Sequence, residues 1–85
     1  MNTPNDQAEQ HIGETKGLPN HAHDLVHDLG SRLDALWRYD QYIANADQAG
    51  VPDSKQFWQE LKTQETKNID RLKELIRQRV KDGSF

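Results

Sequence analysis

The histidines of this chain come closest, by residue type and spacing, to a metal site. His21, His23 and His27 form a group, and His11 precedes them. Since His23 and His27 are four residues apart, they share one face of a helix and could hold a divalent metal ion between them. A zinc protease carries a glutamate directly after the first histidine, and here Asp24 stands there. We therefore favour exposed histidines on a polar helix face and keep metal binding as the alternative.

Glu65 and Asn68 form a second candidate site. Both fall on or beside the apolar stripe of the second helical segment. In helical bundles a Glu-x-x-His run points a carboxylate and an imidazole inward from one face, where they bind metal. Here asparagine stands in place of histidine, and it is a poor ligand for a transition metal. We favour a polar residue that sets the helix register at an interface, with Glu65 as a weaker metal candidate.

No other catalytic pattern is present. The five glycines are scattered and form no phosphate-binding loop, and no serine nucleophile stands beside a histidine. The scattered aspartates do not make the paired carboxylates of a glycosidase. The chain has no cysteine, which excludes disulfides and thiolate metal sites and fits a reducing compartment. We therefore expect no enzyme and no cofactor.

Charge divides the chain into two halves. Residues 20–50 carry five acids against two arginines, and residues 53–85 carry eight bases against six acids, within a net charge of −3. A negative chain has no general attraction to nucleic acid. The late bases suit the negative end of a helix dipole better than a nucleic-acid site, because no aromatic residues interleave with them; they are Arg71, Lys73, Arg77, Arg79 and Lys81.

The first long helix is predicted over about residues 21–49. Residues 1–19 are polar, contain two prolines and two glycines, and are expected to form a disordered tail. Asn20 is expected as the N-cap, and Gly50 is a typical residue to end the helix. The apolar residues recur at spacings of three and four, which is a helical pattern; they include Leu25, Val26, Leu29, Leu33, Leu36, Ile43 and Ala46.

The second helix is predicted over about residues 54–82, after a turn at 50–52. Asp53 is expected as its N-cap, with Gln56 completing a capping box, and Gly83 is expected to end the helix. So short a turn makes the two helices antiparallel, and residues 20–83 form one helical hairpin. The acidic start of the first helix then lies beside the basic end of the second.

The expected fold class is all-α, a hairpin that pairs with a second copy to form a four-helix bundle. An 85-residue chain without disulfides buries little surface, and one hairpin leaves part of its apolar stripe uncovered. Twofold dimers are the commonest closed solution. No apolar run is long enough for a membrane span and no signal peptide is visible, so we expect a cytoplasmic protein. The expected interface residues are Leu29, Leu33, Leu36, Ile43, Trp58, Leu61, Ile69 and Leu72. Trp37 is expected to pack in the core or oligomer, with a partner anchor as the alternative.

The run LWRYDQYI at residues 36–43 resembles the encapsulated ferritins, small ferritin-like hairpin proteins of bacteria. Short uncharacterised hairpins of the same type are similar as well. The resemblance covers about residues 22–79, and it implies an iron-oxidising centre with three ligand positions. Those positions are occupied here by Arg32, Glu65 and Asn68, so only Glu65 keeps the family's ligand. If the packing is kept, the resemblance implies that Arg32 and Glu65 meet as an ion pair in place of the metal.

Three functions therefore remain open from the sequence. The leading one is a non-enzymatic structural or protein-interaction module that associates with itself and with another protein. The second is a ferritin-like metal-binding or iron-handling protein. The third is a small helical regulator or inhibitor that docks one helix face on its target. Nucleic-acid binding ranks last.

Overall fold

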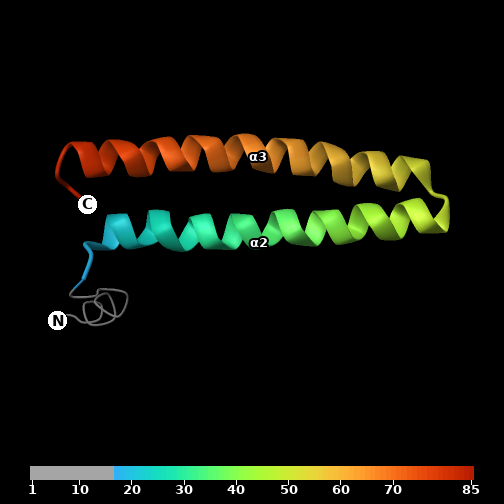
Figure 1. Cartoon of the computed structure of the whole chain (residues 1–85), viewed down its shortest axis with the longest axis horizontal. Helices are drawn as coiled ribbons and strands as arrows, with labels where there is room; N and C mark the ends of the chain where they lie inside the picture. The colour runs from blue at the N-terminus through green and yellow to red at the C-terminus, as the bar shows by residue number, and fades with distance from the viewer. Residues whose placement is uncertain (1–16) are drawn as a thin grey trace, which may run out of the picture.

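The computed structural model describes residues 17–85, which form two long helices. These are α2 (Asn20–Ala49) and α3 (Pro52–Lys81), each of 30 residues, joined by residues 50–51. The helices run antiparallel and lie side by side along their whole length (Figure 1). The predicted all-helical class with two packed helices is confirmed. The proposed tail at residues 1–16, with His11, lies outside the described residues.

Helix α2 starts with a backbone cap, so the expectation of a side-chain cap from Asn20 is wrong. Pro19 is the N-cap, and its carbonyl accepts hydrogen bonds from the backbone N–H groups of Ala22 and His23 at 3.1 and 3.0 Å. Asn20 is instead the first helical residue. Proline suits the cap because its φ of −62° is already fixed and its missing N–H is not needed there.

Both helices end at a glycine in the left-handed conformation. Gly50 has φ +70°, and the next N–H, from Val51, donates to the carbonyl of Ala46 at 3.1 Å. Gly83 has φ +79°, and the N–H of Ser84 donates to the carbonyl of Arg79 at 3.0 Å in the same way. Each is a Schellman motif, which satisfies the last carbonyls of the helix and turns the chain out of it.

Helix α3 begins at Pro52, two residues before the predicted start, and the expected capping box is absent. Val51 is the N-cap, and Pro52 occupies the first helical position, where its ring is well tolerated. The carboxylate of Asp53 accepts a hydrogen bond from the N–H of Ser54 at 2.8 Å, and Gln56 donates to Glu60 at 3.2 Å. Asp53 still places negative charge in the first turn of the helix.

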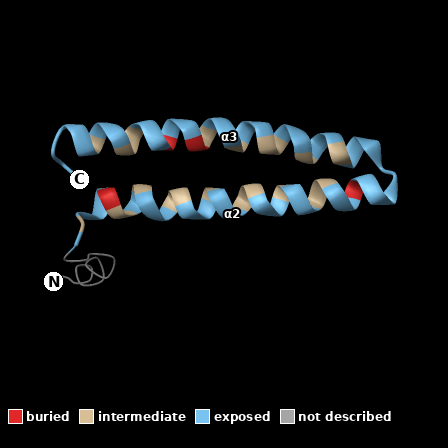
Figure 2. Cartoon of the chain, in the orientation of Figure 1, coloured by how far each residue is buried: buried red, intermediate tan, exposed pale blue. Residues whose placement is uncertain are grey.

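The core of the hairpin is thin. Within residues 17–85, the buried apolar residues are Ala22, Ala46, Ile69 and Leu72, and no large side chain is fully buried (Figure 2). Ile69 and Leu72, expected at an interface between copies, are thus covered within one hairpin. Five other expected interface residues are half-buried, namely Leu29, Leu36, Ile43, Trp58 and Leu61. In the same part of the chain, neither helix combines the length and hydropathy needed to cross a membrane.

Candidate functional site

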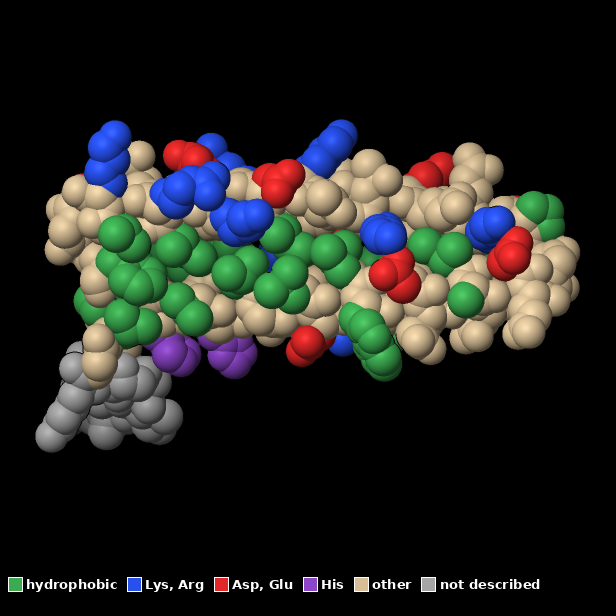
Figure 3. All heavy atoms as spheres, in the orientation of Figure 1, with side chains coloured by type: hydrophobic (Ala, Val, Ile, Leu, Met, Phe, Trp, Pro, Cys, Tyr) green, Lys and Arg blue, Asp and Glu red, His purple; other side chains and the backbone are tan. Residues whose placement is uncertain are grey.

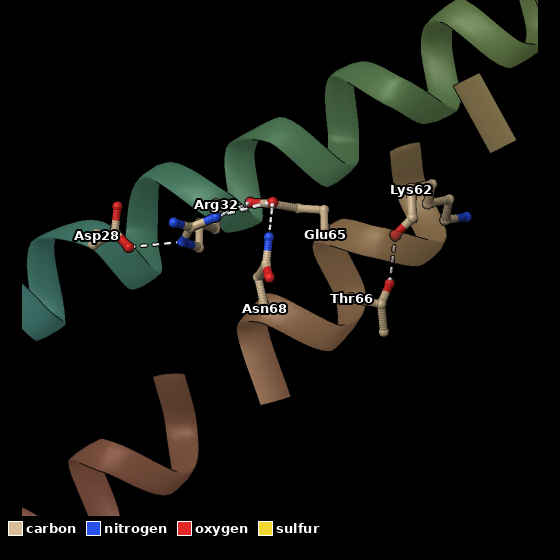
Figure 4. A network of polar contacts seen from close by, with 6 residues as sticks. All are labelled: Asp28, Arg32, Lys62, Glu65, Thr66 and Asn68. Carbon is tan, nitrogen blue, oxygen red and sulfur yellow. Dashed lines mark hydrogen bonds and ion pairs between the residues drawn. The ribbon is translucent and has the colours of Figure 1, made fainter. Parts of the chain in front are cut away.

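An ion pair between the helices lies near the middle of the hairpin. The Nη1 atom of Arg32, on α2, donates hydrogen bonds to both carboxylate oxygens of Glu65, on α3, at 3.0 and 3.3 Å (Figure 4). The structure therefore brings together Arg32 and Glu65, the two residues that were predicted to meet as an ion pair. Thirty-three residues separate them along the chain, so their contact depends on the register of the two helices.

Each member of the pair has a second partner on its own helix. The Nε atom of Arg32 donates to Asp28, one turn earlier, at 2.7 Å. The amide of Asn68, one turn after Glu65, donates to Glu65 Oε1 at 3.2 Å. A chain of four polar side chains thus crosses the hairpin from Asp28 to Asn68 (Figure 4).

Burial differs sharply along this chain of side chains. The Glu65 side chain is only 12% exposed, whereas those of Arg32 and Asp28 are 35% and 49% exposed. The hydrogen bond to Asp28 and the attraction of Glu65 raise the pKa of Arg32, so the guanidinium stays charged at any relevant pH. The least exposed carboxylate therefore has a permanent cation beside it, which offsets the cost of its burial.

Hydrogen-bond donors from both helices contact the Glu65 carboxylate. The guanidinium lies where a cation would approach the carboxylate, and Asn68 offers an N–H donor to Glu65 rather than a ligand atom. In residues 17–85, no group of three or more histidine, aspartate or glutamate side chains is placed to hold a metal ion. The chemistry of this site is therefore that of a salt bridge.

The histidines form a pair at the start of α2. The rings of His23 and His27 lie 5.7 Å apart between centroids, and His23 Nδ1 lies 3.4 Å from the Asp24 carboxylate. His21 is exposed. The predicted helical face is therefore present, but no third ligand joins the pair within the described part of the chain.

A shallow groove of about 280 Å³ borders the ion pair on one flank of the hairpin. Its walls combine polar groups from both helices with two leucines. The wall residues are Asp28, Arg32, Asn68, Arg71, Leu72 and Leu75. Arg71 is the only one of the late bases in this wall, so the basic run does not gather into one site.

Four aromatic side chains pack together near the turn. Trp58 lies 4.8 Å from Tyr42, 5.0 Å from Phe57 and 6.1 Å from Tyr39 between ring centroids, and it stacks on Tyr39. Tyr39, which is absent from the predicted apolar stripe of α2, therefore contributes its ring to the packing between the helices. Trp37 lies outside the group and is 65% exposed, so it does not close the core.

Two further ion pairs, which were not predicted from the sequence, link the helices on the turn side of the centre. Lys55 donates to Asp47 at 2.8 Å, and Lys62 lies 2.6 Å from Asp40. The signal was available in the spacing, since the two aspartates and the two lysines are each seven residues apart. A heptad separation keeps residues on the same side of a helix pair.

The late bases of α3 are partly paired within their own helix. Arg77 contacts Glu74, and Arg79 contacts Asp82, at 3.0 and 2.8 Å. These local pairs support the interpretation of a solvated helix end with cations near the negative end of the dipole.

No family model matches the chain, and neither a curated protein nor a solved structure matches it significantly.

Proposed function

We propose that this chain is a non-enzymatic structural and protein-interaction module of the ferritin-like hairpin type, in which a salt bridge takes the place of a metal centre. The observation that carries the proposal is the contact of Arg32 with both oxygens of Glu65, at 3.0 and 3.3 Å. The guanidinium of Arg32 thus supplies a positive charge where the resemblance implies a bound metal ion.

The role we assign to the pair is to fix how the two helices align. A partly buried salt bridge adds little net stability, but breaking it by a shift of register leaves a charge without its partner. Arginine suits this role because its planar guanidinium can contact two carboxylates at once, Asp28 through Nε and Glu65 through Nη1. The module therefore presents its outer faces in one fixed arrangement.

Self-association is the second part of the proposal. The hairpin buries only four apolar residues well, within residues 17–85, and leaves several large ones half or more exposed. Small helical scaffolds without disulfides or metal gain their missing core by oligomerisation. Two hairpins that share their apolar faces would form a four-helix bundle.

Metal titration tests the first part of the proposal against its rival, an iron-handling protein. Calorimetry with Fe²⁺, Co²⁺ and Zn²⁺ should show no binding that depends on Glu65, and iron oxidation should not exceed that of the buffer. The matched variants are Glu65→Gln and the double variant His23→Gln/His27→Gln. Binding that Glu65→Gln abolishes would overturn the proposal. Binding that only the histidine variant abolishes would assign a separate surface site.

Light scattering tests the second part. A dimer or higher oligomer at micromolar concentration is expected. A stable monomer would contradict self-association and would favour the third function, a regulator whose apolar face is kept for another protein.

A further inference from the structure

One flank of the hairpin is built from four successive layers, each with one residue from either helix. The two layers nearest the turn are the ion pairs Asp47–Lys55 and Asp40–Lys62. One heptad further from the turn, the same side of α2 carries Leu33 and the same side of α3 carries Ile69. We call this surface the layered flank.

The fourth layer, one more heptad along, consists of Val26 and Ile76. The layered flank therefore changes from charged to apolar halfway along the molecule. Figure 3 shows acidic and basic side chains across the seam toward the turn, and apolar side chains gathered over the start of α2 and the end of α3.

On α2, the apolar half of the layered flank is open to solvent in a single hairpin, whereas Ile69 on α3 is already covered within it. Leu33 is 48% exposed and Val26 is 43% exposed on α2, and Val80, four residues after Ile76 on α3, is 57% exposed. An added Cβ at Gly30, between Val26 and Leu33 on α2, would meet nothing within 4 Å. Exposed apolar side chains grouped on one face are typical of an interaction site.

We infer that a second copy of this chain docks on the layered flank, with a twofold axis that runs parallel to the helices. This inference rests on the self-association proposed above and specifies its surface and symmetry. In this arrangement α2 of one hairpin faces α3 of the other, and every layer stays at the same height.

The order of the layers selects this axis. With the axis parallel to the helices, Asp40 faces Lys62 of the second copy, and Leu33 faces its Ile69. At every layer, a charged residue then faces the opposite charge on the second copy, or an apolar residue faces an apolar one. A twofold interface between two identical surfaces requires this match. A twofold axis perpendicular to the helices would reverse the order and bury the charged Asp47–Lys55 layer against the apolar layer of Val26, at a high desolvation cost.

The overall charge of the helices agrees with the same axis. Residues 20–50 carry an excess of three negative charges, and residues 53–85 carry an excess of two positive charges. The parallel axis sets each acidic helix against the basic helix of the second copy. It also makes every pair of neighbouring helices antiparallel, so that opposite ends of the helix dipoles lie together.

A matched pair of glutamate variants tests the surface. Leu33→Glu, in the layered flank, is expected to weaken the dimer at least tenfold in dissociation constant, because it places a charge in an apolar layer. Phe57→Glu makes the same type of change at a side chain that is 50% exposed but lies beside Trp58 on the other side of α3, and it should leave the dimer intact. Circular dichroism checks that both variants stay helical.

Spin labels test the symmetry on a chain that is otherwise unchanged. The chain has no cysteine, so Ser54→Cys gives one label near the turn of each hairpin. The parallel axis puts both turns at the same end, and the label distance should be about 15–30 Å, given interaxial distances of about 8–10 Å. A perpendicular axis puts them at opposite ends of helices about 45 Å long, with a correspondingly long distance.

The outcomes separate the inference from the proposal beneath it. A wild-type chain that is monomeric overturns both. A wild-type dimer that survives Leu33→Glu overturns the surface, and a long label distance overturns the symmetry, while self-association stands in each case. A dimer weakened by Leu33→Glu alone, with a short label distance, supports the inference.

Discussion

Asn68 donates its side-chain amide to Oε1 of Glu65 at 3.2 Å, from one turn further along α3. Arg32 donates to the same oxygen from α2 at 3.0 Å. The carboxylate is therefore held from its own helix as well as from the opposite one. A glutamate has three rotatable bonds, and the hydrogen bond from Asn68 on the same helix restricts them. This ordering lowers the entropy cost of forming the ion pair between the helices.

The first prediction concerns the removal of one partner of that pair. Arg32→Met should lower the free energy of unfolding by about 1–3 kcal/mol, because it leaves the largely covered Glu65 carboxylate without its cation. Urea denaturation followed by circular dichroism measures this. The double variant Arg32→Met/Glu65→Leu should recover most of the loss, since apolar pairs often replace ion pairs at no cost. Additive losses in the double variant would contradict an energetic coupling between the two residues.

The second prediction concerns a gain of metal binding. The double variant Arg32→Glu/Asn68→His should bind Co²⁺ or Zn²⁺, because it replaces a cation and an amide by a carboxylate and an imidazole beside Glu65 and Asp28. The visible absorption of Co²⁺ reports the ligands directly. The control is the triple variant with Glu65→Gln added, which should lose the spectrum. If the double variant folds but binds no metal, the likeness to a ferritin-type centre would not extend to its geometry.

The third prediction concerns the glycine inside α2. Gly30→Ala should raise the free energy of unfolding by about 0.5–1 kcal/mol, because alanine is the better helix former and its methyl group meets nothing within 4 Å. Thermal unfolding measures the change. A matched substitution, Gly50→Ala, should be destabilising, because the φ of +70° at that position suits glycine. A loss of stability in Gly30→Ala would indicate that the second copy docked on the layered flank leaves no space for the added methyl group.

The fourth prediction separates the two tryptophans. Trp58→Ala should lower the free energy of unfolding by about 3 kcal/mol, since its ring packs against three other aromatic rings. Trp37→Ala should change it by less than about 0.5 kcal/mol, because that ring is 65% exposed. Urea unfolding curves of the two variants provide the comparison, and equal losses would place Trp37 in the packed core.

The fifth prediction concerns the acid range. Hydrogen bonds from Ser84 and Arg79 lower the pKa of Asp82 from 3.8 to about 2. A lowered pKa in the folded state means that the charged form stabilises the end of α3 above about pH 4, and that this is lost as the pH falls through about 2. Carbon NMR of the carboxyl group measures the value.

A pair of substitutions provides the control for that measurement. Ser84→Ala should raise the pKa of Asp82 toward its ordinary value, because it removes the hydrogen bond that lowers this pKa most. Lys55→Met should raise the pKa of Asp47 and leave that of Asp82 unchanged, because Lys55 pairs with Asp47 at the other end of the helix. A pKa of Asp82 that does not respond to Ser84→Ala would contradict the assigned cause.

Long-range features of the hairpin were accessible from the sequence because they repeat. Each helix shows a regular spacing of apolar residues over about thirty positions. A glycine, which adopts the left-handed conformation easily, indicates the end of each helix. The meeting of Arg32 with Glu65 was expected on a different ground, because the resemblance to the encapsulated ferritins implied that both residues occupy ligand positions. None of these inferences depended on a single side-chain conformation.

The exact helix starts and the packing of one aromatic ring could not be predicted from the sequence, because neighbouring residues compete for these roles. Asn20 and Asp53 both have side chains that cap helices well, but in each case a neighbouring proline decided where the helix began. Tyr39 interrupts an aliphatic pattern on paper, although its ring stacks on Trp58 in the fold. An aromatic side chain can reach across to a partner that a count of aliphatic spacing does not register.

The two-residue link between the helices also has a consequence for the kinetics of folding. Asp47 and Lys55, next to that link, are only eight residues apart in sequence, whereas Arg32 and Glu65 are 33 apart. The entropy lost on loop closure rises with this separation, so the contacts of the hairpin should form first next to the link and last at the free ends. Most of these contacts are local enough for rapid folding. The far end closes last and, in a lone chain, should open first. Amide hydrogen exchange should therefore slow progressively from the free ends of the helices toward the link.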